Sequence, residues 1–192
     1  MVAHSHVLGG IEKHISVLAR ELGRLGHSVA YAGPTDGWLG AQMQALGCDC
    51  IHLPMHGMYD PISAWKLRRF ARKWRADVIH GHAQRGARYA RLGARGICKV
   101  VVSAHSTTAW KWFGPDHPII AVSAAVRDAL LDRGCSPEQV KVIHLGTEDP
   151  GHGLPPLPGP ITAERPLKLG LIGRLARVNG PDIALQAIST MR

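Results

Sequence analysis

Short apolar segments alternate with longer segments of helical periodicity along the first 146 residues of this chain. Parallel strands need crossover connections, which are usually helices, so this alternation predicts an α/β fold: a Rossmann-like parallel sheet with helices on both faces. We expect strands at 1–7, 28–32, 50–53, 77–80, 99–104, 119–122 and 140–143, and helices between Gly10 and Gly26 and at 40–46, 62–75, 83–95 and 124–133. The strand 77–80 contains the apolar pair Val78-Ile79, and we expect it in a central position.

The composition changes after residue 146. Six prolines and three glycines fall between residues 150 and 166, and prolines at this density disfavour both helix and sheet. We therefore expect a domain at 1–146, a linker at 147–166, and the first strand–helix unit of a second α/β domain at 167–192. The chain would then carry one lobe of a two-lobed protein, with the second lobe truncated and the cleft between the lobes incomplete.

Positive charge is concentrated in one segment. The chain of 192 residues has a formal net charge of +9, and twelve Lys and Arg residues against a single acid, Asp77, lie between Pro61 and Pro115. Such a surface attracts polyanions, anionic lipid headgroups or phosphorylated substrates, although a solvated surface without a partner is the simpler explanation of a charge run. No apolar run approaches the roughly 20 residues of a membrane span, and the N-terminus lacks the pattern of a secretory signal. A cytoplasmic location is expected.

The cysteines give a weak metal-binding pattern. Cys48, Cys50 and His52 could ligate a metal on paper, but the second ligand pair of a structural zinc site is missing. We expect small, half-buried side chains there and no metal site.

A glycine pair stands between the first predicted strand and the first predicted helix. Backbone amides at a helix N-terminus bind phosphate, and Gly9 and Gly10 would let a ligand approach closely. The pair is not the G-x-G-x-x-G dinucleotide fingerprint, and no acidic residue ends the second strand where a ribose would be held. A nicotinamide cofactor is therefore disfavoured.

Polar side chains follow two neighbouring strands. His80 and His82 end the fourth strand, and His105 follows the fifth, with Ser106 and Thr107 directly after it. Ligands of open α/β sheets bind beyond these strand ends, where an imidazole can hydrogen-bond a hydroxyl group or act as an acid or base. A histidine with a purely structural role is the alternative in each case, and for His82 the two interpretations are equally well supported.

Arg174 lies between a predicted strand end and a predicted helix, beside Gly173. An arginine in this position suits a diphosphate, because its guanidinium group and the helix amides can both bind phosphate oxygens. A surface arginine in a loop is the alternative.

Taken in order, these motifs resemble the family 4 glycosyltransferases of the GT-B fold. The matching stretches are residues 9–14, 77–82, 103–105, 119–126, 141–143 and 173–175. The resemblance implies two Rossmann-like domains: an N-terminal domain that binds the acceptor and a C-terminal domain that binds most of the nucleotide-sugar. It also implies transfer with retention of anomeric configuration and without a bound metal.

The resemblance also assigns roles to residues. It implies that His105 is the catalytic residue and hydrogen-bonds a sugar, and that Arg174 helps to neutralise the leaving diphosphate. The remaining site residues are Gly9 and Gly10 for the donor phosphates and His80, His82, Ser106 and Thr107 for the acceptor. The expected partners are a nucleotide-sugar donor and a glycan or lipid-linked acceptor, with no cofactor and no nucleic acid. The basic helix 62–75 could contact the anionic inner face of a membrane through Trp65, whereas core packing is expected for Trp74.

The chain departs from the family pattern at several positions. Asn179 stands where the family usually has a lysine, and His144-Leu145 replaces a Pro-Asn pair. The carboxylate pair that holds the donor in this family falls outside the sequence. Two other functions stay open: a nucleotide-sugar epimerase on the same scaffold, and a non-enzymatic domain that binds polyanions or a membrane surface through the basic segment.

Overall fold

The computed structural model describes residues 1–146, 159, 162, 169–173 and 175–190. It divides into two compact units, Met1–Glu148 and Asp149–Arg192, and each is described by itself. Most of the predicted linker at 147–166, and Arg174, lie outside the described residues. In the part of the chain that the structure describes, no helix is long and apolar enough to cross a bilayer.

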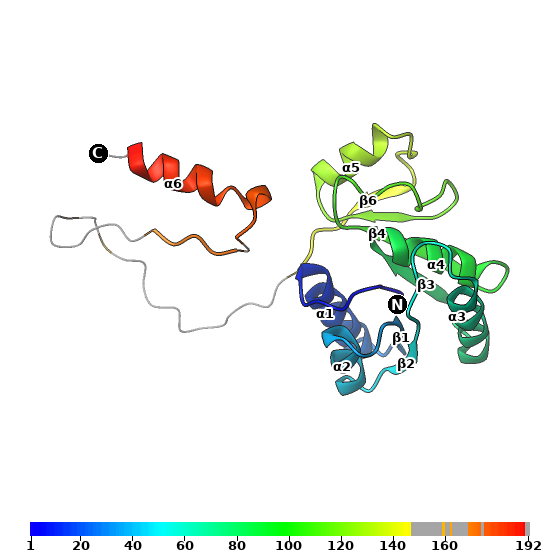
Figure 1. Ribbon diagram of the computed structural model, residues 1–192. Coiled ribbons are helices and arrows are strands. Elements are labelled where there is room, and N and C mark those ends of the chain that lie inside the picture. The colour runs from blue at the N-terminus through cyan, green and yellow to red at the C-terminus, as the bar shows by residue number, and fades with distance from the viewer. Residues whose placement is uncertain (147–158, 160–161, 163–168, 174, 191–192) are drawn as a thin grey trace. The chain divides into compact units, whose positions relative to one another are not determined.

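The first unit is built on a parallel sheet (Figure 1). Strands β2 and β1 pair with each other, and β3, β4, β5 and β6 pair in that order. Val2 joins the two groups, because it bridges in parallel to Ala32 of β1 and to Gly81 of β3. The strands are β1 (Ala30–Gly33), β2 (Asp49–His52), β3 (Val78–His82), β4 (Lys99–Ala104), β5 (Ile119–Ala121) and β6 (Val140–Val142). β3 is central, as predicted.

Five helices were predicted in this unit, and all five form. They are α1 (Gly10–Arg24), α2 (Trp38–Ala45), α3 (Pro61–Trp74), α4 (Ala83–Ala94) and α5 (Ala124–Leu131). Ser123 caps α5 as expected, since its hydroxyl accepts a hydrogen bond from the Val126 amide at 3.3 Å. Asp60 caps α3 in the same way through the Ser63 amide.

Successive side chains along the strands point to opposite faces of the sheet, and different helices cover each face. Ala3 and Tyr31 are buried together with Ile15 of α1 and Leu39 of α2. Their neighbours in sequence point to the opposite face, where Val2 and Ala32 join the larger core beneath α3, α4 and α5. This arrangement confirms the Rossmann-like fold with helices on both faces.

The first strand is shorter than the predicted 1–7. The Val2 amide donates to the His80 carbonyl at 2.8 Å, the His82 amide donates to the Val2 carbonyl at 2.9 Å, and the Ala32 amide donates to the Met1 carbonyl at 2.9 Å. Pairing stops after residue 3 because β1 ends at Gly33 and β3 passes directly into α4 after His82. A parallel strand cannot continue where its neighbours have ended.

Two glycines allow α4 to lie close to this short strand. A Cβ atom on Gly86 would lie 2.4 Å from the carbonyl oxygen of Val2, and one on Gly81 would lie 2.6 Å from the carbonyl oxygen of Gly86. Both obstacles are backbone atoms, which cannot move aside as the end of a side chain can. The contact between α4 and the centre of the sheet therefore requires glycine at both positions.

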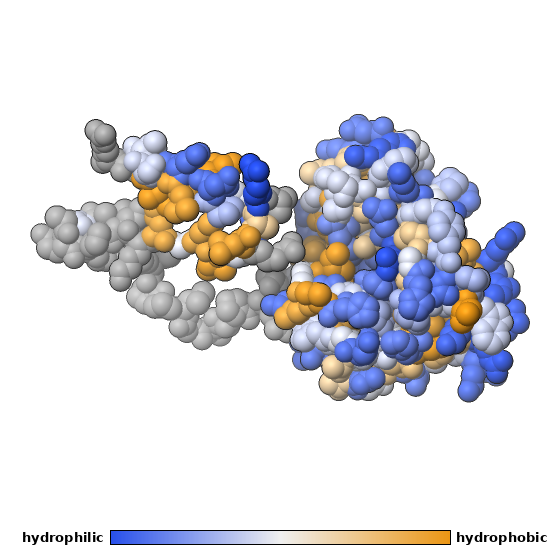
Figure 2. All heavy atoms as spheres, viewed as in Figure 1, coloured by the Kyte–Doolittle hydropathy of each residue, from blue (hydrophilic) through white to orange (hydrophobic). Residues whose placement is uncertain are grey.

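The second unit contains η1 (Arg177–Asn179) and α6 (Pro181–Thr190), close to the predicted helix at 179–191. The preceding strand was predicted from Leu167, but residues 169–173 adopt no strand. A parallel strand forms only against a neighbour, and none of the described residues supplies one here. Leu171 and Ile172 are exposed, and Figure 2 shows hydrophobic residues over much of this unit's surface.

We predict that Gly86→Ala destabilises the first unit by about 1 to 3 kcal/mol, because the new methyl group must displace the Val2 backbone. The free energy of unfolding, measured by urea denaturation, tests this. The matched control is Gly23→Ala in α1, where the added methyl group meets no atom within 4 Å and should stabilise the helix by up to about 1 kcal/mol. Equal stabilisation by the two substitutions would contradict the close contact.

Candidate functional site

Four histidines meet at the carboxyl edge of the sheet. His80 and His82 belong to β3, His105 follows the last residue of β4, and His14 belongs to α1. His80 and His82 alternate with Ile79 and Gly81, so they point to the face of the sheet that α1 covers. The edge lies beside the point at which the sheet reverses its order, between the Val2 bridge and β3.

The imidazole rings form a contiguous group. The ring centroids of His80 and His82 are 4.1 Å apart, and those of His82 and His105 are 5.5 Å apart in a stacked arrangement. His14 approaches His82 at 5.9 Å and His105 at 5.6 Å, edge to face in each case. His80 Nε2 shares a hydrogen bond of 2.8 Å with the Ser103 hydroxyl, and His82 Nδ1 shares one of 3.3 Å with His105 Nε2.

Burial keeps these imidazoles uncharged. It is the main cause that lowers the pKa of His80 from 6.5 to about 3 and the pKa of His105 to about 4. Nearby positive charge contributes to these values, from the N-terminal ammonium group and neighbouring histidines at His80 and from His14 at His105. The same causes lower the pKa of His82 well below 6.5, and burial lowers the pKa of His14. At neutral pH the site therefore offers dipoles, each with one N–H donor and one lone pair.

The His82–His105 pair has unused hydrogen-bonding capacity. One ring donates a hydrogen bond and the other accepts it. In either tautomer this leaves one N–H group on one ring and one lone pair on the other without a partner. These positions are His82 Nε2 and His105 Nδ1, which are buried and have no hydrogen-bond partner in the structure. A buried polar atom without a partner is costly, and such atoms are common where a protein performs chemistry.

The N-terminus of α1 lies on the same side as the imidazoles. Gly10 and His14, one helical turn apart, line a cavity of about 590 Å³ together with α2 and Gly146. The structure therefore brings the glycine turn and the His105 ring together through His14, which the sequence prediction required.

The two glycines differ in their surroundings. Gly10 is exposed, and nothing lies within 4 Å of the position of a Cβ atom on it, so a ligand can approach its backbone. A Cβ atom on Gly9 would lie 2.8 Å from Oε2 of Glu12, a carboxylate that is buried in the first turn of α1. The end of the Glu12 side chain can move aside, so this contact alone does not require glycine at residue 9, and the role of Gly9 toward a phosphate stays a prediction.

The remaining predicted site residues differ in exposure, and one of them lies outside the described residues. Ser106 and Thr107 are exposed directly after His105, with the Ser106 hydroxyl 3.1 Å from the Thr108 hydroxyl. His82 is only 1% exposed and is in contact with the His105 ring, so its predicted contact with an acceptor stays a prediction. The placement of Arg174 is outside the described residues, and its role stays a prediction.

Sequence reasoning did not include His14 and Ser103 among the site residues. His14 lies four residues after Gly10, a spacing that puts both on one face of a helix, so this signal was present in the sequence. Ser103 lies two residues before His105 and therefore on the same face of β4. Its hydrogen bond to His80 depends on the register of β3 and β4, which the sequence does not reveal.

The histidines and cysteines do not come together as a metal site in the part of the chain that the structure describes. Among the described residues, no group of three His, Cys, Asp or Glu side chains is arranged to hold a metal ion. Cys48 and Cys50 are half-buried free thiols, and the Cys50 thiol donates to the Cys48 carbonyl at 3.3 Å. The prediction of chemistry without a metal remains to be tested.

The fold and the site together define a class: α/β domains that bind a ligand at the carboxyl edge of a parallel sheet, beside a switch point in strand order. The sequence profile of Glycosyltransferase Family 4 matches residues 8–150, which is most of the chain. The chain belongs to this family, as its motifs indicated. No curated protein sequence matches the chain.

Solved structures share the fold. The chain matches HepE from Anabaena, crystallised with UDP and glucose, with a TM-score of 0.63 and 16% identity over 77% of this chain and 44% of HepE. A glycosyltransferase from Rickettsia africae matches with a TM-score of 0.63 and 20% identity over 74% and 41% of the two chains. A putative UDP-N-acetylglucosamine 2-epimerase from Listeria monocytogenes matches with a TM-score of 0.50 and 11% identity over 72% and 42%. The chain thus spans less than half the length of each of these proteins.

We predict that the stability of the first unit falls as the pH is lowered from 6.5 toward 4. The pKa values of His80 and His105 are lower in the folded state than the ordinary 6.5, so the unfolded chain binds more protons in this range. Stability is complete above pH 6.5 and decreases by about 1 kcal/mol per pH unit for each such histidine. Urea denaturation at several pH values measures the slope.

The variant His80→Gln removes one titrating ring and can keep a hydrogen bond to Ser103, so its slope should be shallower. Repeating the series in high salt separates this effect from general charge repulsion, which salt screens. A slope that His80→Gln leaves unchanged would show that the buried imidazoles are not its source.

Proposed function

We propose that this chain forms the acceptor-binding domain of a glycosyltransferase that moves a hexose from a nucleoside diphosphate to a hydroxyl group with retention. The observation that carries the proposal is the position of the His105 ring. It lies beside the rings of His82 and His14, and His14 is one helical turn from Gly10, which is exposed at the N-terminus of α1. Membership of Glycosyltransferase Family 4 supports the reaction type. HepE, whose structure contains UDP and glucose, supports UDP-glucose as the first donor to examine.

His105 is the proposed catalytic residue. A neutral imidazole can hydrogen-bond a hydroxyl group of the transferred sugar without the desolvation cost of a buried charge. Its partner His82 is proposed as a positioning residue, because it is buried and its Nδ1 lies 3.3 Å from His105 Nε2. The hydrogen bond of His80 with Ser103 holds β3 and β4 together behind this pair.

The phosphates require a different kind of group. Negative charge on the leaving diphosphate grows as the glycosidic bond breaks, so donors aimed at it lower the barrier. The amide of Gly10 at the positive end of the α1 dipole, together with Arg174, is proposed to supply them without a metal ion or cofactor. The exposed hydroxyls of Ser106 and Thr107, with His80 behind them, are proposed to face a glycan or lipid-linked acceptor.

The first test uses the longest polypeptide encoded by the gene, incubated with a panel of nucleotide-sugars. We predict that His105→Ala lowers the rate of donor hydrolysis or transfer at least tenfold, about 1.4 kcal/mol of barrier. His27→Ala changes an exposed histidine just beyond α1 and should leave the rate unchanged. An unaltered rate for His105→Ala would reject the assigned role.

An epimerase acting on nucleotide-sugars is the second candidate, because the Listeria protein shares the fold. Such an enzyme cleaves and re-forms the donor and needs no acceptor. Product analysis without an acceptor separates the two functions: the epimerase yields a new nucleotide-sugar, whereas the transferase yields only slow hydrolysis.

We further propose that α3 contacts an anionic membrane surface. Trp65 is 58% exposed, Arg69 lies over its ring at 5.8 Å, and Arg68 and Arg72 border the same groove of about 310 Å³. An exposed tryptophan among arginines suits the interface between lipid headgroups and hydrocarbon. Trp74, on the same helix, is half-buried and donates to the Asp49 carboxylate at 2.9 Å, so it packs at the edge of the domain rather than in the core, where the sequence predicted it.

We predict that replacing both Arg69 and Arg72 by Gln weakens binding to phosphatidylglycerol vesicles at least tenfold, since each basic residue contributes about 1 kcal/mol near such a surface. Vesicle co-sedimentation measures this, with phosphatidylcholine vesicles as the uncharged comparison. The double substitution of Arg133 and Lys141 by Gln removes the same charge elsewhere and should have little effect. Equal losses in the two variants would indicate general charge attraction, which is the behaviour of the polyanion-binding alternative.

A further inference from the structure

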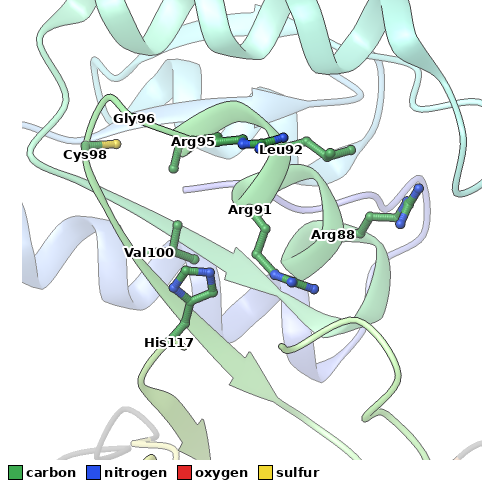
Figure 3. Close-up of a pocket in the computed structure, with 9 residues that line it drawn as sticks. Arg88, Arg91, Leu92, Arg95, Gly96, Cys98, Val100 and His117 are labelled. Carbon is green, nitrogen blue, oxygen red and sulfur yellow. The ribbon is translucent and has the colours of Figure 1, made fainter. Parts of the chain in front are cut away.

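The connection between β4 and β5 leaves a cavity beside α4. Every other crossover between named strands of the first unit contains a helix, but residues 105–118 form turns and bends. The part of the sheet that a helix would cover is bordered instead by a cavity of about 460 Å³. Figure 3 shows Arg88, Arg91 and Leu92 of α4, with Arg95 directly after the helix, around this cavity, and Val100 of β4 and His117 of the loop across from them.

Three arginines border the cavity without a carboxylate partner. Arg88 and Arg91 are three residues apart on one face of α4, and Arg95, the residue that follows the helix, lines the same cavity. Like charges at this spacing repel one another. In the described part of the chain, no Asp or Glu forms an ion pair with any of them. Their clustering therefore opposes stability unless an anion neutralises it.

Arg91 has an unused donor inside the protein. Its Nη1 donates to the Trp112 carbonyl at 3.2 Å, but its Nε is buried and has no hydrogen-bond partner. The guanidinium group lies against Gly114, where a Cβ atom would be 2.5 Å from its central carbon. Gly114 also has φ of +76°, which favours glycine independently. The loop thus leaves room for the Arg91 guanidinium and holds it in place.

Arg88 is also fixed in position. Its guanidinium lies 4.3 Å from the ring centroid of Tyr59 and 4.2 Å from that of Trp112, and its Nε donates to the Met58 carbonyl. Contacts with two aromatic faces orient the group and lower the conformational entropy that a ligand would otherwise have to remove. Arg95 is exposed at the rim of the cavity.

The cavity is separate from the histidine site. Val100 has the same parity along β4 as Val102 and Ala104, which belong to the core beneath α4, whereas His80 and His82 point to the α1 face. The cavity also lies near the beginning of β4, and His105 follows its end. No residue lines both this cavity and the one at Gly10.

We propose that this cavity, the arginine pocket, binds a phosphate ester. Guanidinium groups bind phosphate through paired N–H donors, and three of them border this cavity, so together they would neutralise the charge of the ester. Leu92, Val100 and the half-buried Cys98 provide an apolar wall for the organic part of the ester. The same chemistry occurs in soluble sugar and glycerol phosphates and in phospholipid headgroups.

The test uses the 192-residue chain and follows the Nε–H resonance of Arg91 by NMR during titration with sn-glycerol 3-phosphate. A saturable shift of this resonance is expected. Phosphatidylglycerol bicelles form a second arm: a shift with bicelles alone identifies a lipid headgroup as the source, and a shift with the soluble ester identifies a free phosphate. Both results support the pocket, and both are independent of vesicle binding through α3. No shift of the Arg91 resonance with either probe, up to about 10 mM, overturns the proposal.

A second test compares the affinities of substituted variants by calorimetry. The titrant is sn-glycerol 3-phosphate, or the bicelles if only these bind. Arg95→Gln alters an exposed side chain, so the fold should be retained, and it should weaken binding roughly fivefold or more. Lys141→Gln removes an exposed positive charge from β6 and serves as the matched control, with less than a twofold effect expected. An equal loss of affinity in the two variants would assign the binding to net charge and reject the pocket.

Discussion

Three residues at the centre of the sheet, Met1–Ala3, hold the first unit together. Val2 exchanges backbone hydrogen bonds with His80 and His82, and the carbonyl of Met1 accepts from Ala32, so the two groups of strands become one sheet. The segment also directs the chain into α1, which brings Gly10 and His14 to the edge where β3 ends. The placement of the candidate site thus follows from a very short stretch of strand pairing.

The fold could be read from the sequence because burial patterns are local. The apolar pair Val78-Ile79 indicated the central strand, and Ser123 identified the start of α5. The failures involve pairing partners. The strand predicted from residue 1 to 7 stops when its neighbours stop, and residues 169–173 have apolar side chains but no neighbouring strand. A sequence pattern indicates that a segment can form a strand, but it does not show whether a neighbouring strand is present to pair with it.

The site was predicted less completely, because its chemistry depends on contacts between distant segments. The sequence placed His80, His82 and His105 at one edge, which the structure confirms as a location. It did not reveal that His82 is buried behind His105, nor that Glu12 occupies the space over Gly9. The missing crossover helix after β4 was visible as a long loop, but the unsatisfied Arg91 Nε at its border was not.

The uncharged state of the imidazole cluster has a consequence for how an anion would bind there. A phosphate that arrives near His105 and His14 favours their protonated forms, so binding would draw protons from the solvent. The heat of binding would then vary with the ionisation enthalpy of the buffer. Mild acid would strengthen the attraction for the anion while weakening the fold that creates the pocket, so affinity and stability would have opposite pH dependences over the same interval.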